Sequence, residues 1–176
     1  MDQKTQKILI DRCLKNDRKS QRELYELYKN AMFTLCLRIT ADHDDAKDAL
    51  QDGFIAVFNS LSSFKGQSTI GAWIKTIIVR TALRKTKKLH FDSLENIEDQ
   101  TVSFDDSFSG EVLHNAIMKL DPGFRTVFIL YEVEGYSHKE IAELINISEG
   151  TSKSQLHYAK KKLQSIIVNL YEYERR

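Results

Sequence analysis

Turn-forming residues are scarce in this chain, whose 176 residues include one proline and seven glycines. Barrels and sandwiches need a turn after every short strand, and this supply of turn residues is too small for them. Long stretches are instead rich in leucine, lysine, glutamate, alanine and glutamine, which favour helices. The sequence therefore predicts an all-α fold.

The formal net charge of +1 hides an uneven distribution of charged residues. Residues 1–90 hold 17 basic and 10 acidic side chains, residues 91–113 hold seven acidic and no basic ones, and residues 114–176 hold nine basic and eight acidic ones. The acidic stretch has no sustained apolar period, which indicates a flexible linker. We expect two small helical domains, over 1–90 and 112–176, joined by an acidic linker over 91–111.

The sequence contains no sign of export or of a membrane span. The first residues lack the apolar core of a signal peptide, and no run approaches the roughly 20 apolar residues that cross a bilayer. Cys13 and Cys36 lie in apolar helical patterns without the spacing of a metal site, so we expect buried thiols. These features predict a cytoplasmic protein without membrane insertion, metal or cofactor.

Apolar spacing in the first domain predicts three helices, over about 20–39, from 46 to 61 and from 70 to 88. The predicted buried stripe of the first of these contains Leu24, Leu27, Tyr28, Ala31, Met32, Leu35 and Ile39. In the second helix, Asp45, Asp48 and Asp52 are three and four residues apart and share one face. Their mutual repulsion costs stability unless a basic group or a metal ion meets them.

A basic segment follows this acidic face, because no acid occurs between Asp52 and Asp92. The segment contains Lys65, Lys75, Arg80, Arg84, Lys85, Lys87 and Lys88. A small polar loop over residues 65–69 precedes the third helix, and aromatic Phe64 and Trp73 stand on either side of it. Such a pattern suits the phosphates of a nucleic acid, although a solvated helix end is an ordinary alternative.

The last domain carries the pattern of a helix-turn-helix. Asp121 precedes Pro122 as the expected cap of one helix, and Ser137 with Glu140 forms a capping box for the next. Asn146 tolerates the positive φ of a tight turn, and Ser148 caps another helix. Helices of about seven and fifteen residues would thus be joined by a three-residue turn. The second helix would expose Lys153, Ser154, Gln155, His157, Tyr158 and Lys161 to base edges and phosphates. A plain helical hairpin of a bundle is the alternative.

Several strings together resemble a known family. They are residues 22–28, 44–54, 64–66 and 72–74 in the first domain, and 120–122, 134–144 and 150–154 in the last. In this order they are similar to bacterial sigma factors of the sigma-70 class, and specifically to the short extracytoplasmic-function (ECF) group, which keeps two of the conserved domains. The resemblance implies a protein without enzymatic activity that binds core RNA polymerase and promoter DNA. It also implies control by an anti-sigma factor.

The resemblance implies three binding surfaces. The surface for core polymerase would consist of Asp45, Asp48, Gln51, Asp52 and Phe54. The surface for the −10 element would consist of Lys65, Gly66, Gln67, Ser68, Thr69, Trp73, Lys75, Arg80, Arg84, Lys87 and Lys88, with the loop receiving a flipped base. The surface for the −35 element would consist of Ser137, Lys139, Ser148, Thr151, Lys153, Ser154, Gln155, His157, Tyr158 and Lys161.

The chain departs from the common family pattern at several of these positions. Ser152 replaces a frequent valine, and Gln155 and Tyr158 replace frequent arginines. Because glutamine pairs with adenine and arginine with guanine, we expect an altered −35 preference. We also expect Ser152 to weaken the packing of the last domain. In the basic helix, Arg80 and Arg84 replace a common asparagine and a common aspartate.

Two other functions deserve weight. A stand-alone helix-turn-helix regulator that acts without polymerase needs only the last domain and leaves the strings of the first domain unexplained. An enzyme of phosphoryl transfer could use Asp44, Asp45, Asp48 and Asp52 to bind Mg²⁺. No histidine or glutamate stands beside those aspartates as a general base, which argues against the enzyme.

Overall fold

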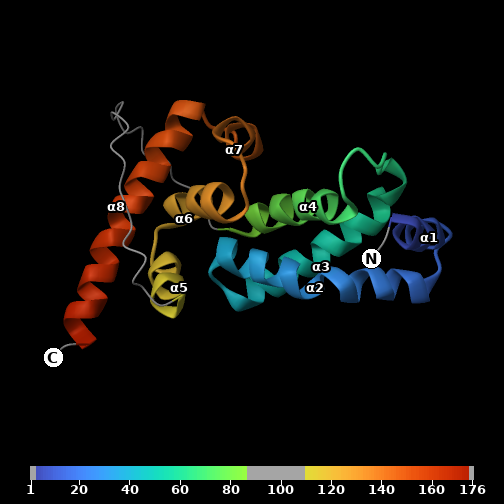
Figure 1. The fold of residues 1–176 in the computed structure, drawn as a ribbon, viewed down its shortest axis with the longest axis horizontal. Helices are drawn as coiled ribbons and strands as arrows, with labels where there is room; N and C mark the ends of the chain where they lie inside the picture. Colours follow the sequence, from blue (N-terminus) through green and yellow to red (C-terminus); the bar gives the residue numbers. More distant parts are fainter. Residues whose placement is uncertain (1–2, 87–109, 175–176) are drawn as a thin grey trace. The chain divides into compact units, whose positions relative to one another are not determined.

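The computed structural model describes residues 3–86 and 110–174 and divides the chain into two compact units, Met1–Thr86 and Lys87–Arg176. All regular elements in these described ranges are helices, which confirms the all-α prediction (Figure 1). Most of the expected linker lies outside the described residues. Its last two residues, Gly110 and Glu111, belong to a helix, so the second helical unit begins two residues earlier than the charge pattern suggests.

The described part of the first unit contains four α-helices and one 3-10 turn. They are α1 (Gln3–Leu14), α2 (Arg18–Thr40), α3 (His43–Ser60), η1 (Leu61–Ser63) and α4 (Ile70–Lys85). Helices α2, α3 and α4 pack against one another, and α1 packs against α2 and η1. The apolar spacing predicts α2 to α4 within a few residues, but it does not predict α1.

Local capping hydrogen bonds set where these helices begin. The Asp42 carboxylate accepts hydrogen bonds of 2.9 Å from the backbone N–H groups of Asp44 and Asp45 at the start of α3. The Thr69 hydroxyl accepts one of 3.2 Å from Ala72 at the start of α4. Each cap satisfies N–H groups that have no partner within the first turn of a helix.

A close approach of α3 and α4 forms the centre of the first unit. Gly53 lies against Ile78, and a β-carbon at position 53 would stand 2.5 Å from the Ile78 Cδ1 atom. Ile70, Ile74 and Ile78 follow one stripe of α4 and are fully buried. A larger residue at position 53 would therefore need the end of the Ile78 side chain to shift, because α3 and α4 pack closely at this point.

The buried stripe of α2 is narrower than predicted. Leu27 is 52% exposed and Ala31 is also exposed, whereas Leu24, Leu35 and Ile39 are buried. The prediction that Leu27 and Ala31 belong to the core is wrong, because the helices that pack on α2, namely α1, α3 and α4, leave these two residues uncovered. The prediction for the two cysteines is confirmed, since Cys13 and Cys36 are buried with free thiols.

The second unit contains α5 (Gly110–Met118), α6 (Pro122–Phe128), η2 (Ile129–Val133), α7 (His138–Ile145) and α8 (Glu149–Glu174). Helix α8 has 26 residues instead of the expected fifteen, and its long core face packs against α5, α6 and α7. The α6 helix continues into η2 as one turn of π-helix before Gly135, where φ is 75°.

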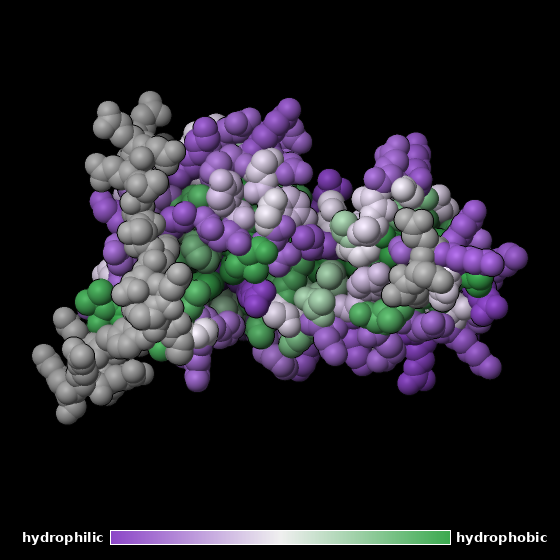
Figure 2. Space-filling model, viewed as in Figure 1, coloured by the Kyte–Doolittle hydropathy of each residue, from purple (hydrophilic) through white to green (hydrophobic). Residues whose placement is uncertain are grey.

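On the face that Figure 2 shows, hydrophilic side chains cover much of the surface, with apolar patches between them.

The expected cap of α6 is absent. Asp121 occupies the N-cap position, but its side chain makes no capping hydrogen bond there. Its carboxylate instead accepts a hydrogen bond from the Lys162 ammonium group of α8. An ion pair between helices has thus replaced the local cap that the Asp-Pro sequence predicts.

Candidate functional site

The acidic face of α3, defined as Asp45, Asp48, Gln51 and Asp52, meets a basic group from α4. The Lys85 ammonium group lies 2.9 Å from the Asp52 carboxylate and 4.0 Å from that of Asp48. The hydrogen bond to Asp52 raises the pKa of Lys85, and the charges of these aspartates add to the effect. Asp48, Gln51 and Asp52 remain exposed, so one lysine relieves part of their repulsion while the face stays open to solvent.

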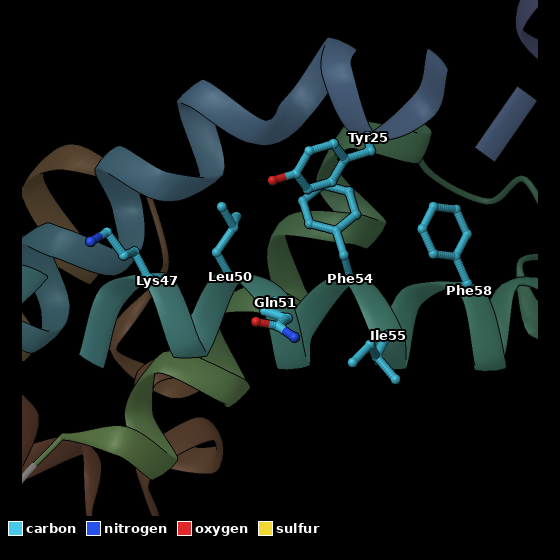
Figure 3. A pocket seen from close by; sticks show the side chains of 7 residues that line it. All are labelled: Tyr25, Lys47, Leu50, Gln51, Phe54, Ile55 and Phe58. Atoms are coloured by element: carbon cyan, nitrogen blue, oxygen red, sulfur yellow. The ribbon is translucent and has the colours of Figure 1, made fainter. Parts of the chain in front are cut away.

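Phe54 differs from its predicted place on this surface. Its side chain is 3% exposed, and its ring packs edge-on against Tyr25 of α2 with centroids 4.8 Å apart. It lines an open pocket of about 450 Å³ whose other lining residues are Tyr25, Lys47, Leu50, Gln51, Ile55 and Phe58 (Figure 3). Phe54 therefore adds no exposed area to the expected polymerase surface, and its part in polymerase binding stays a prediction. Ile55, which is 52% exposed, is an apolar residue beside the acidic face.

Each residue of the loop over 65–69 is exposed, and the loop is held at both ends. Gly66 has a φ of 71°, which favours glycine, and Thr69 caps α4 as described above. Just before the loop, the Phe64 ring packs against the Trp73 ring of α4 with centroids 5.5 Å apart. The two ends of the loop are thus joined by an aromatic contact, because Phe64 precedes the loop and Trp73 lies in the first turn of α4.

An open groove of about 620 Å³ lies between this loop and α1. Residues of α1 line it together with Phe64 and four residues of the loop; the α1 residues are Gln6, Lys7, Ile10, Asp11 and Leu14. The sequence pattern did not indicate these residues because nothing local to α1 shows that it packs beside the loop. At this end of α1, Leu14 is unusual for a large apolar residue because it is 44% exposed.

The basic residues of α4 do not share one face. At 100° per residue, Trp73, Arg80 and Arg84 fall within about 40° of one another, whereas Lys75 falls on the opposite flank. Arg80 and Arg84 are exposed, and the Arg84 guanidinium donates a hydrogen bond of 3.2 Å to the Thr81 hydroxyl. Helix α4 ends at Lys85, and the predicted contacts of Lys87 and Lys88 lie outside the described residues.

The helix-turn-helix forms with the predicted local signals. The Ser137 hydroxyl accepts from the Glu140 backbone N–H, and the Glu140 carboxylate accepts from the Ser137 N–H at 2.8 Å, which confirms the capping box. Asn146 has a φ of 56° in the turn, as predicted. The Ser148 hydroxyl then accepts a hydrogen bond of 2.9 Å from Thr151 at the start of α8.

Ser152 has a defined polar partner. It is fully buried, and its hydroxyl lies 2.9 Å from His138 Nδ1 in a hydrogen bond that joins α8 to the first turn of α7. The His138 ring stacks on Tyr131 with centroids 4.3 Å apart. The serine therefore exchanges the apolar contact of a valine for a hydrogen bond between the two helices, a compensation that the sequence pattern did not anticipate.

The outer face of α8 is only partly as predicted. Lys153 and Lys161 are exposed, and Ser154, His157 and Tyr158 are half-buried. Gln155 is 1% exposed, so the prediction that its side chain faces outward is wrong. Its position is three residues after Ser152 and four before Ala159, both of which are buried, and this spacing was a signal for a core residue.

Ion pairs with neighbouring acids neutralise two of the lysines on the basic surface of the second unit. Lys160 lies 2.7 Å from the Glu132 carboxylate, and Lys162 pairs with Asp121. Lys139 of α7 is exposed, whereas Thr151 is half-buried with its hydroxyl 2.8 Å from that of Ser148. The exposed cations that remain along the helix-turn-helix are therefore Lys139, Lys153 and Lys161.

Within the described ranges, no three histidine, cysteine or acidic side chains come together in a way that could hold a metal ion. Asp44 of the aspartate cluster instead lies 3.5 Å from Lys47. None of the helices that the structure describes has the length and apolar character needed to cross a bilayer.

Comparisons with known proteins match both units to one family. Residues 24–90 match the model for sigma-70 region 2, and residues 110–163 match that for sigma-70, region 4. The RNA polymerase sigma factor YlaC of Bacillus subtilis is 30% identical over 169 residues, which cover 90% of this chain and 98% of the relative. The ECF RNA polymerase sigma-E factor of Haemophilus influenzae is 25% identical over 94% of this chain and 97% of its own length.

A solved structure shows the same fold. The sigma factor RpoE of Bartonella quintana, solved in complex with the anti-sigma factor NepR, matches with a TM-score of 0.54 and 22% identity, covering 83% of this chain and 95% of that one. The two family models follow the chain in order, on the two units that the structure separates. The chain therefore belongs to the sigma-70 family of bacterial RNA polymerase sigma factors, within its extracytoplasmic-function group.

Proposed function

We propose that this sigma factor binds core RNA polymerase through the acidic face of α3 and contacts the two promoter elements with its two helical units. As a member of its family it is a transcription initiation factor and not an enzyme. The observation that carries the proposal is the order of surfaces along the chain: an exposed acidic face, an exposed loop beside an aromatic pair, and a capped helix-turn-helix.

The acidic face supports polymerase binding because its charges are exposed and only partly neutralised. Among the residues that the structure describes, Lys85 is the basic group that approaches Asp48 and Asp52, and it lies at the far end of α4 from the loop. A basic surface on the polymerase would complete the neutralisation, and complementary charge also speeds the encounter. Half-exposed Ile55 and the adjoining pocket offer an apolar contact in the middle of this surface, with buried Phe54 beneath it.

The loop and the outer face of α4 support contacts to the −10 element. The loop residues are exposed, and Trp73, Arg80 and Arg84 continue from it along one side of α4. Aromatic rings and arginines on one track suit an unpaired strand, because bases stack on the rings and phosphates pair with the cations. Lys75 lies on the opposite flank, so we expect it to contribute less to this surface.

Helix α8 supports contacts to the −35 element in a major groove. Lys153, His157 and Lys161 occupy its outer face, and Tyr158 lies at the edge of that face with its ring 6.4 Å from Phe124. Around the turn, Ser137, Lys139, Ser148, Thr151 and Ser154 supply polar groups for phosphates, although the Ser154 hydroxyl donates to the Gly150 carbonyl at 2.7 Å. Gln155 has no place in this surface, because its side chain is buried.

We further propose that an anti-sigma factor controls this protein in the cytoplasm. The proposal is supported by the relative RpoE, which was solved with its anti-sigma factor NepR. In this proposal the first domain extends to residue 90, and the second, predicted to start at 112, includes all of α5 from Gly110.

Reconstitution with core polymerase tests the proposal. The wild-type protein should co-elute with core enzyme in size-exclusion chromatography and direct transcription from mapped start sites. Asp48→Lys should weaken the complex, because it places a cation on the surface that meets basic groups. Glu23→Lys makes the same change of charge on exposed α2 and serves as the control. Equal binding by Asp48→Lys and the wild type would refute the docking assignment.

The same reconstitution separates a stand-alone regulator from a sigma factor. A regulator would bind operators equally well with and without core polymerase and would need only the second unit. The match of residues 24–90 to sigma-70 region 2 disfavours that function, because a regulator of this kind has no use for the first unit.

A further inference from the structure

We infer that Lys85 competes with core polymerase for the acidic face of α3, so that its ion pairs form an autoinhibitory contact within the first unit. The inference rests on the proposed docking of this face and extends it. It assigns a regulatory role to a residue of α4 that lies outside the three proposed binding surfaces. In the free protein, Lys85 would occupy the place of one cation of the polymerase.

Core packing places the Lys85 side chain beside the acidic face. Helices α3 and α4 lie side by side, and Gly53 of α3 packs against Ile78 of α4 (Figure 1). Asp52 is the neighbour of Gly53. Lys85 follows Ile78 by seven residues, which returns it to the same side of α4. The ion pairs of Lys85 therefore belong to a close contact between two packed helices.

Lys85 neutralises part of the charge that a polymerase would meet. The acidic face holds the charges of Asp45, Asp48 and Asp52. The Lys85 ammonium group lies 2.9 Å from the Asp52 carboxylate and 4.0 Å from that of Asp48. In the described part of the chain, Lys85 is the cation that forms ion pairs with this face, and it leaves two of the three negative charges for a partner.

A polymerase cation and Lys85 need the same carboxylate oxygens. A docked cation gains less from Asp52 while the Lys85 ammonium group stays bound there, and displacing that group breaks an existing hydrogen bond. In both cases the internal ion pair reduces the attraction between the two proteins. Lys85 is half-buried whereas Asp48 and Asp52 are exposed, so the contact lowers the affinity without closing the surface.

The position of Lys85 separates it from the cations proposed to meet DNA. At 100° per residue, Lys85 falls about 100° from Arg84 and about 140° from Arg80 around α4. Its ammonium group reaches α3, whereas both arginines are exposed. A contact of Lys85 with promoter DNA is therefore the disfavoured alternative, and the experiment below detects it.

The test measures binding of the full chain, labelled at its N-terminus, to core polymerase by fluorescence anisotropy at several salt concentrations. Lys85→Met removes the charge and keeps an unbranched side chain. It should tighten binding roughly two- to fivefold at low salt, the factor that one exposed ion pair supplies. The gain should shrink as salt rises, because salt screens exposed charges. Lys85→Gln should give the same gain, which separates the lost charge from an apolar contact of methionine with polymerase.

Three controls isolate the ion pair. Lys15→Met makes the same change of charge at an exposed site between α1 and α2 and should leave the affinity for polymerase unchanged. Lys85→Arg keeps a cation and should bind as the wild type does. When Asp48→Asn and Asp52→Asn are already present, Lys85→Met should give no gain, because the carboxylates for which Lys85 competes are gone.

The docking assignment and the inference fail on different results. If Asp48→Lys binds core polymerase as tightly as the wild type, the docking assignment fails. If Asp48→Lys weakens binding but Lys85→Met leaves the affinity unchanged or lowers it, the inference alone is overturned, as it is if Lys15→Met gives an equal gain. Weaker binding of the Lys85→Met holoenzyme to promoter DNA, with unaltered affinity for core polymerase, would assign Lys85 to the −10 surface and also overturn the inference.

Discussion

Ser137→Ala should loosen the helix-turn-helix by removing one half of its capping box. In the wild type the Ser137 hydroxyl accepts a hydrogen bond from the Glu140 N–H at 3.3 Å and donates one to the Glu140 carboxylate at 2.7 Å. Alanine at an N-cap costs about 1 kcal/mol, within a range of roughly 0.5 to 2. The total stability of a unit of this size is roughly 3 to 10 kcal/mol, so the loss is measurable.

The expected change is a melting temperature lowered by roughly 4 to 8 °C for the second unit only. The chain has one tryptophan, Trp73, which lies in the first unit and reports that unit by fluorescence. Far-ultraviolet circular dichroism follows the helices of both units. In Ser137→Ala the circular dichroism transition should therefore broaden or split towards lower temperature, while the tryptophan transition stays in place.

Two matched variants complete this test. Ser137→Thr retains a capping hydroxyl and should restore most of the stability. Ser165→Ala makes the same chemical change at an exposed interior position of α8 and should be neutral or slightly stabilising. Equal melting of Ser137→Ala and Ser165→Ala, or an equal shift of the Trp73 signal, would refute the role assigned to the capping box.

The cap also predicts a dependence on pH. The Ser137 hydroxyl and its backbone N–H donate to the Glu140 carboxylate and lower its pKa below the ordinary value of 4.5. The folded state thus favours the ionised form, so this contribution is present above about pH 4.5 and is lost as the pH falls through the lower folded pKa. Glu140→Gln should remove that dependence, which denaturation between pH 3 and 6 would measure.

Three further outcomes follow from the burial and charge of named residues. Lys161→Ala should weaken binding to all promoter sequences alike and reduce the salt slope by about 1, as measured by titration at several salt concentrations; a change confined to one base position would contradict this. Gln155→Arg should lower the unfolding free energy of the second unit by about 2 kcal/mol or more, because it buries a charge. A stable variant with a new base preference would contradict the burial. Cys13 and Cys36 should react slowly with a thiol reagent at pH 8, because burial raises their pKa values to about 11 and about 12. Denaturant should make both react quickly, and rapid reaction in the folded protein would count against that burial.

Much of the fold could be predicted because its signals are local. The capping box at Ser137, the turn at Asn146 and the cap at Asp42 each depend on residues within four positions of one another. Apolar spacing likewise predicts α2, α3 and α4 almost to their ends. Such patterns succeed because the hydrogen bonds that begin and end a helix are made within the same segment.

The contacts of particular side chains on the binding surfaces could not be predicted in this way. The pairing of Lys85 with Asp52, the burial of Phe54 under Tyr25 and the groove that α1 forms beside the loop all join segments distant in sequence. For Gln155 the sequence held two opposing signals. Its spacing from buried neighbours indicated the core, whereas its polar side chain indicated the surface, and the structure buries it.

The amino-acid sequence by itself determined that this protein is helical, that it has two units, and that it carries the strings of a sigma factor. Only the tertiary structure decided which charged side chains stay exposed and could meet polymerase or DNA. Others form ion pairs within the protein, as Lys162 does with Asp121. The physical reason is that helix periodicity depends on neighbours three and four residues away, whereas the exposure of a side chain depends on which other helix packs over it.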